Sequence, residues 1–198
     1  MIEHSSVLLA LHYQNENCHP DGKIKLGIAA DAPWREPRLN NARRLLAGVR
    51  EAGVPIIHVR LAVHPDYANV RANTPLIRQW IELGAWREGT WGVEFLQGLE
   101  PVGNEIVVTH TRNSVFHGCS LPDTLTALGA EHLYVAGVST AYVVESSVRQ
   151  ATDIGYTCTV IADACATATE EQHQNALTAM QVLAEISSVD NVLAQLRE

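Results

Sequence analysis

Short apolar segments alternate with helix-like segments along almost the whole chain, and this alternation restricts the folds available to it. Continuous apolar runs of strand length occur at 6–11, 54–59, 105–109, 133–136 and 157–161. Helical periodicity occurs between them, at 37–52, 121–128, 140–154 and 170–184. Strands separated by helices pair in parallel through right-handed crossovers. The pattern predicts a three-layer α/β/α sandwich around a Rossmann-like, mostly parallel sheet of about six strands, with the last short strand at 186–189.

The length of the chain fits one domain, which we place at residues 1–198. The segment 62–98 is the least regular part, and we expect it to cross over the strand ends with short helices at most. Its tryptophans favour burial against the sheet or against a second subunit.

Charge and cysteine content exclude several classes of protein. The net charge of −8 and the absence of a Lys/Arg cluster argue against nucleic-acid binding. No apolar run is long enough to cross a membrane, and no basic segment precedes an apolar run at the start, so we expect neither a membrane span nor a signal peptide. The four cysteines lack CxxC spacing and indicate reduced thiols in a cytoplasmic protein.

Two histidines and one turn fall at the predicted carboxyl ends of strands. His12 follows the first strand, His110 ends the third, and the turn 137–143 follows the fourth. Ligands bind at the carboxyl ends of strands in open parallel sheets. Because an imidazole titrates near neutrality and can both donate and accept, the two histidines are candidates for acid–base chemistry.

Three ordered motifs resemble those of the isochorismatase-like hydrolases, a superfamily that includes nicotinamidases, N-carbamoylsarcosine amidases and ureidoacrylate amidases. The motifs are Leu11-His12-Tyr13-Gln14-Asn15, Phe116-His117-Gly118-Cys119-Ser120-Leu121 and Gly137-Val138-Ser139-Thr140-Ala141-Tyr142-Val143 with Val144-Glu145-Ser146-Ser147. The resemblance covers nearly the whole chain and implies the isochorismatase-like fold.

Against this family pattern the catalytic triad is degenerate. The resemblance places His12 where the family has an aspartate, His110 where it has a lysine, and Val143 where thiol members have the nucleophilic cysteine. A valine cannot attack a carbonyl, so a thioacyl intermediate at this position is excluded. The resemblance also implies a cis peptide bond between Val138 and Ser139 and an oxyanion site beside it.

Isochorismatases proper also lack the thiol and use the aspartate as a general acid, but this chain lacks the aspartate as well. We therefore expect His12 and His110 to supply an acid and a base for hydrolysis, or for an elimination, of a small polar molecule, with a bell-shaped pH profile near neutrality. The alternative is a catalytically inactive homologue that binds a small ligand or serves as an assembly subunit.

Further residues are predicted around the pocket. Trp91 and Phe116 are expected as pocket walls and His117 as a rim residue, and Gln14 is expected to brace the loop after the first strand. Tyr142 either points into the site or packs on its helix. We expect no cofactor, and no metal although His64-Pro65-Asp66 resembles a reversed metal motif. The resemblance implies a homo-oligomer, a dimer or tetramer.

Overall fold

The computed structural model describes residues 5–197, and a six-stranded sheet in the order β3-β2-β1-β4-β5-β6 forms its centre. The strands are β1 (Ser6–Leu11), β2 (Ile56–Leu61), β3 (Ile106–His110), β4 (His132–Gly137), β5 (Thr157–Ile161) and β6 (Glu185–Ser187). Every neighbouring pair is parallel. The predicted α/β fold with about six mostly parallel strands is confirmed.

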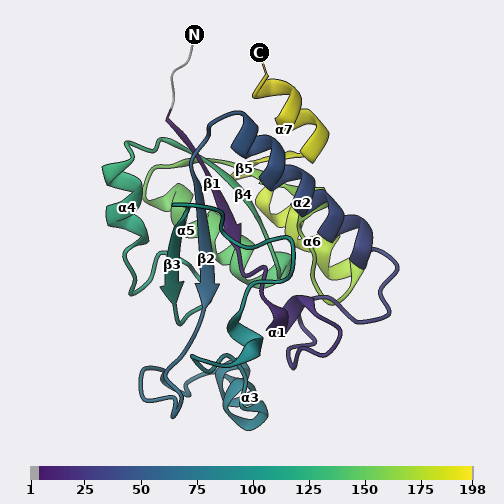
Figure 1. Ribbon diagram of the computed structural model, residues 1–198, viewed down its shortest axis with the longest axis vertical. Helices are drawn as coiled ribbons and strands as arrows, with labels where there is room; N and C mark the ends of the chain where they lie inside the picture. The colour runs from purple at the N-terminus through teal and green to yellow at the C-terminus, as the bar shows by residue number, and fades with distance from the viewer. Residues whose placement is uncertain (1–4, 198) are drawn as a thin grey trace.

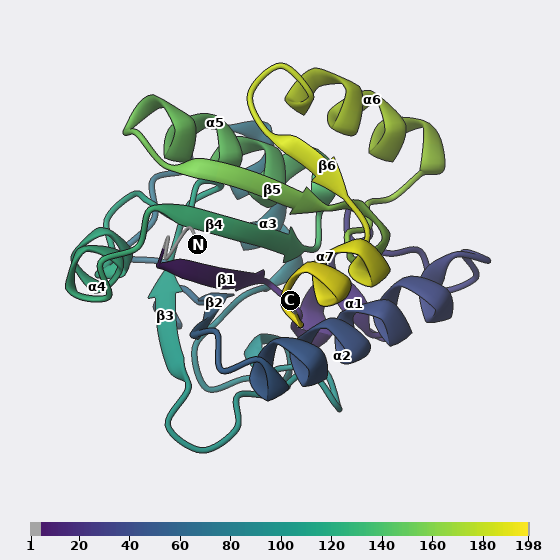
Figure 2. The same ribbon diagram turned by 90° about the horizontal axis from the view of Figure 1, so that it is seen from above.

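Helices cover both sides of this sheet (Figure 2). The helices of the sandwich are α2 (Arg35–Glu51), α4 (Leu121–Ala127), α5 (Glu145–Asp153), α6 (Glu170–Met180) and α7 (Val189–Gln195). Helix α2 packs with α7 on one side, and α5 packs with α6 on the other. The apolar stripe of α2, from Leu39 to Val49, is buried, as its helical spacing predicts.

Some element boundaries differ from the sequence prediction for local reasons. Strand β2 begins at Ile56 and not at residue 54, since Pro55 has no N–H to donate and only its carbonyl bonds to Leu8. The predicted helix 140–154 is two segments, a π-helix η2 (Thr140–Val144) followed by α5. Single π turns are often found at functional sites. The short helix α1 (Asn15–Cys18) was not predicted.

The segment 62–98 contains α3 (Pro75–Leu83) and η1 (Trp91–Val93). Figure 1 shows α1 and α3 beyond the arrowheads of β1 and β2, so this segment lies across the strand ends as expected. It forms a second buried apolar cluster that includes Leu61, Trp80 and Trp86. This cluster becomes one wall of the site.

Strand register brings the predicted site segments to one edge. Leu11 of β1 is level with Gly137 of β4, and Leu61 of β2 is level with His110 of β3. The residue after β1 and the turn after β4 therefore emerge side by side, as parallel pairing requires.

Candidate active site

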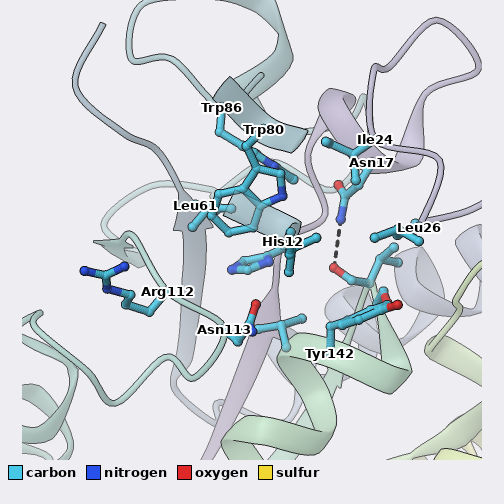
Figure 3. A pocket seen from close by; sticks show the side chains of 15 residues that line it. His12, Asn17, Ile24, Leu26, Leu61, Trp80, Trp86, Arg112, Asn113 and Tyr142 are labelled. Carbon is cyan, nitrogen blue, oxygen red and sulfur yellow. Dashed lines mark hydrogen bonds between the residues drawn. The ribbon is translucent and has the colours of Figure 1, made fainter. Parts of the chain in front are cut away.

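A small cavity of about 40 Å³ lies at the carboxyl ends of the strands. Figure 3 shows His12 in its centre, between tryptophans of the segment 62–98 and the first turn of η2. The residues that line it are His12, Asn17, Ile24, Leu26, Gly27, Leu61, Leu76, Trp80, Trp86, Arg112, Asn113, Val138, Ser139, Tyr142 and Val143. Apolar walls with a few polar groups are typical of a site for a small molecule.

His12 is placed by the end of β1. Its N–H donates to the carbonyl of Val59, which continues the β1–β2 ladder by one residue. The backbone then turns into the left-handed region, with a φ of 52°. For a residue other than glycine this conformation costs roughly 1–2 kcal/mol. The surrounding structure therefore holds His12 in a conformation that directs its ring to the cavity, with only 5% of the residue exposed.

The structure brings His12 and His110 into direct contact through their Nε2 atoms. Their ring centroids are 4.7 Å apart. His110 is 1% exposed and does not belong to the cavity lining. The two imidazoles are thus arranged in series, with His110 behind His12, and do not face a ligand from two sides as the sequence suggested.

The hydrogen bonds of the pair determine which nitrogens carry protons. Nδ1 of His110 is 3.2 Å from the carbonyl oxygen of Ser114, which can only accept. Nδ1 of neutral His110 is therefore protonated and its Nε2 is an acceptor. It follows that Nε2 of His12 donates to His110. The lone pair of His12 is left on Nδ1.

That lone pair is open to the cavity. Nδ1 of His12 forms no hydrogen bond within residues 5–197, and it is not among the buried side-chain atoms that lack a partner. Since His12 lines the cavity, Nδ1 is the atom that can accept a proton from a bound molecule.

Both imidazoles are neutral at pH 7. Burial, reinforced by the adjacent His110, lowers the pKa of His12 well below 6.5. Burial lowers the pKa of His110 to about 4, although the Ser114 carbonyl opposes the shift. If these two histidines govern activity, activity should fall only at a pH below neutrality, where they become protonated. They cause no loss of activity on the alkaline side of pH 7, because they are already neutral there. This differs from the bell-shaped profile expected from unperturbed imidazoles.

Val143 lines the cavity and is 2% exposed. No cysteine takes over the missing thiol, because none of Cys18, Cys119, Cys158 and Cys165 belongs to the lining. Burial raises the pKa of Cys18, Cys158 and Cys165 to about 12, which keeps these thiols protonated.

The peptide bond between Val138 and Ser139 is cis, as predicted, and both residues line the cavity. Figure 3 shows the amide of Asn17 bonded to the carbonyl of Val138, at 2.8 Å. Asn17 was not identified from the sequence. Its position on α1, three residues after Gln14, was the only available signal, and that short helix was itself not predicted.

Trp86 and Glu16 are further site residues that the sequence did not reveal. The indole of Trp86 has its ring centroid 6.1 Å from that of His12, and its Nε1 has no acceptor within the described part of the chain. Glu16 is buried, and its Oε2 accepts the backbone N–H of Trp86 at 3.0 Å. A carboxylate in α1 therefore fixes the tryptophan over the catalytic candidate.

Of the predicted site residues Gln14 and Tyr142, only Tyr142 lines the cavity. The Gln14 amide is fully buried and bonds to both backbone groups of Leu61 and to the Val93 carbonyl. It joins the loop after β1 to β2 and η1, and it does not line the cavity. Tyr142 does line it, at the start of η2 (Figure 3).

The remaining predicted pocket residues lie outside the cavity lining. Trp91 is 47% exposed and its ring contacts His19 edge-on. Phe116 is buried and packs near Tyr156. His117 is exposed and lines a neighbouring cavity, so it lies at the rim.

Within residues 5–197, no three His, Cys, Asp or Glu side chains lie close enough together to share a metal ion. His64 and Asp66 form an exposed two-residue contact. None of the helices in that range has the length and apolar content needed to span a bilayer.

An isochorismatase domain model matches residues 6–191. An uncharacterized isochorismatase family protein, YddQ of Bacillus subtilis, is 30% identical over 166 residues, which is 83% of this chain and 79% of that protein. The ureidoacrylate amidohydrolase RutB of Variovorax paradoxus is 27% identical over 173 residues, 80% of this chain and 68% of that protein.

Solved structures agree in fold. A cysteine hydrolase from Pseudomonas syringae pv. phaseolicola superposes with a TM-score of 0.86 at 18% identity, over 98% of this chain and 92% of that one. The N-carbamoylsarcosine amidase from Thermoplasma acidophilum gives a TM-score of 0.75 at 22% identity, over 94% of this chain and 97% of that one. The sequence match over nearly the whole chain, together with this shared fold, shows that the protein belongs to the isochorismatase family.

Proposed function

We propose that this protein hydrolyses a C–N bond of a small amide or ureide, with water as the nucleophile and His12 as the general base. The observation that carries the proposal is the open lone pair on Nδ1 of His12, which the hydrogen bonds to His110 and Ser114 leave facing the cavity. Val143 offers no nucleophile, so the attacking group comes from solvent.

His12 alone can carry out both proton transfers of the hydrolysis. Nδ1 of His12 takes a proton from water while the water oxygen bonds to the carbonyl carbon. The C–N electron pair then leaves with the nitrogen, and the same proton passes from Nδ1 to the leaving amine. A carboxylic or carbamic acid and an amine result, and His12 returns to its starting tautomer.

His110 has a positioning role in this scheme. It accepts the N–H of His12 and thereby fixes both the ring orientation and the tautomer of the base. Its own bond to the Ser114 carbonyl fixes its tautomer in turn. Positioned general-base catalysis contributes about 10²–10⁴-fold to a rate.

A backbone donor supports the charge that develops on the carbonyl oxygen. The backbone N–H of Ser139, in the cis peptide, has no acceptor among the residues that the structure describes. A donor without a protein partner is available to an oxyanion in the transition state.

The comparisons support the substrate class. RutB relatives at 26–29% identity are named ureidoacrylate amidohydrolases, and one structural neighbour is an N-carbamoylsarcosine amidase. Both names describe amide or carbamoyl cleavage.

The test is a turnover panel of small amides and ureides with wild type, His12→Gln and His110→Phe. Glutamine at position 12 can keep a donor toward His110 and removes the base, so we expect activity to fall about 10²–10⁴-fold. Phenylalanine at position 110 keeps the ring volume and removes the acceptor. His19→Gln, a partly exposed histidine outside the cavity, is the matched control.

The readout for His110 separates positioning from folding. Nitrogen NMR of wild type should show Nδ1 of His12 unprotonated and Nε2 protonated, and His110→Phe should abolish this preference while circular dichroism is unchanged. Full activity of His12→Gln on a substrate that wild type hydrolyses would overturn the proposal. Binding without turnover across the panel would instead favour a ligand-binding protein.

A further inference from the structure

The turn after β4 holds its backbone donors in different ways. The N–H of Val138 donates to the carbonyl of Leu11 at 3.0 Å. The N–H of Thr140 donates to the carbonyl of Ala166 at 2.8 Å. The N–H of Ser139, between them, has no acceptor in the part of the chain that the structure describes. Since Ser139 lines the cavity, this donor is available to a bound molecule.

The carbonyl of the same peptide group accepts a hydrogen bond from α1. Nδ2 of Asn17 lies 2.8 Å from the carbonyl oxygen of Val138, and Asn17 is 4% exposed and also lines the cavity (Figure 3). Because a carbonyl can only accept, this bond assigns the orientation of the amide. Its Oδ1 then faces the thiol of Cys18 at 3.6 Å. Burial raises the pKa of Cys18 to about 12, so the thiol keeps the proton that it donates.

These contacts form one chain of donors that leads to the cavity. The thiol of Cys18 donates to Asn17, and Asn17 donates to the carbonyl of Val138. The N–H of Ser139 belongs to the same peptide group as that carbonyl. A hydrogen bond accepted by a peptide oxygen draws electron density from the nitrogen through the amide resonance, which makes the N–H a stronger donor. The bond from Asn17 also fixes the peptide plane, because it joins α1 to a turn 121 residues further along the chain.

We infer that Asn17 is a positioning residue for the hydrolysis: it orients and polarises the N–H of Ser139, which binds the oxyanion of the transition state. The inference rests on the proposed function for the presence of that oxyanion. The carbonyl oxygen carries more negative charge in the transition state than in the bound substrate. A stronger N–H donor should therefore act on kcat much more than on KM.

Asn15 provides a matched control on the same short helix. Its Nδ2 also donates to a backbone carbonyl, that of Trp91 at 3.1 Å, and the residue is 6% exposed. Asn15 does not line the cavity. Asn15→Leu and Asn17→Leu are therefore the same change of side chain, and each removes the donor from one carbonyl. Only Asn17→Leu removes it from the turn beside His12.

The kinetic experiment measures kcat and KM of the full-length protein for the amide of the turnover panel that wild type hydrolyses fastest. Removing an oxyanion donor altogether costs about 10²–10³-fold in kcat, so we expect the loss of its positioning partner in Asn17→Leu to cost about 10-fold. KM should stay within about 2-fold of wild type. Asn15→Leu should keep the wild-type kcat. Asn17→Ala repeats the comparison with a smaller side chain that cannot clash.

NMR of the ligand-free protein tests the same inference without a substrate. Wild type should show a scalar coupling across the hydrogen bond from Nδ2 of Asn17 to the carbonyl carbon of Val138. The amide proton of Ser139 should move upfield in Asn17→Leu and in Asn17→Ala but not in Asn15→Leu, because its peptide group loses polarisation only in the first two.

The two measurements separate this inference from the proposed function. A missing coupling in wild type, an unmoved Ser139 proton in both Asn17 variants, or a rise in KM with unchanged kcat would overturn the inference. If wild type hydrolyses nothing in the panel, the proposed function fails. The coupling and the Ser139 shift then decide alone whether Asn17 positions this donor.

Discussion

Acidification should destabilise this protein through its buried imidazoles, and His110 allows the effect to be estimated. Burial lowers the pKa of His110 from 6.5 to about 4. In the unfolded chain the ring is solvated and regains its ordinary pKa, so the unfolded state binds the proton first as pH falls. Above pH 6.5 neither state is protonated and His110 adds no pH dependence.

Between pH 6.5 and about 4 the unfolded state alone is protonated at this residue. Each pH unit in that window lowers the free energy of unfolding by about 1.4 kcal/mol, a total of about 3 kcal/mol. Below the folded pKa both states are protonated and the loss levels off. Such a loss is a large part of the stability of a typical domain.

Urea denaturation of wild type and His110→Gln at pH 7 and pH 4 measures how much His110 contributes to the change in the free energy of unfolding with pH. The absolute stabilities will differ because the variant loses the contacts of His110, so the quantity of interest is the change with pH. Wild type should lose about 3 kcal/mol more than His110→Gln over the interval. Parallel curves for wild type and His110→Gln would refute the argument.

Two other predictions follow from the wall of the cavity. Trp86→Phe keeps the aromatic packing and removes a buried N–H that has no acceptor within residues 5–197, so we expect the melting temperature to stay unchanged or to rise. A fall in melting temperature of several degrees would contradict this expectation. Gly92→Ala would place a Cβ 2.2 Å from Oε2 of Glu16 and displace the carboxylate that holds Trp86. We expect a loss of about 1–3 kcal/mol by denaturant titration. An unchanged free energy of unfolding would contradict this account.

The sheet could be predicted from the sequence because its strands are continuous apolar runs between helical segments. His12 and His110 could be located because they stand at the ends of such runs. Their arrangement in series could not be predicted, since it depends on a left-handed turn at His12 and on the Ser114 carbonyl behind His110. Neither feature can be recognised from the pattern of residues in the sequence.

The segment 62–98 was predicted to cross the strand ends, but the positions of its individual side chains were not predicted. Trp86 could not be distinguished there from Trp91, although one lines the cavity and the other is half exposed on the surface. The difference arises from Glu16, which binds the Trp86 backbone from a helix too short to show periodicity. Long-range bonds of this kind join segments about 70 residues apart and are invisible to local spacing.

His12 follows β1 and His110 ends β3, and these strands are not neighbours because β2 lies between them. The contact between the two histidines therefore depends on two strand pairings at once, and β3 is the edge strand of the sheet. A one-residue slip of β3 would turn His110 to the opposite face. Local opening of that edge would separate the base from its partner while His12 and the cavity walls stay in place, so catalytic competence should be lost before the domain as a whole unfolds.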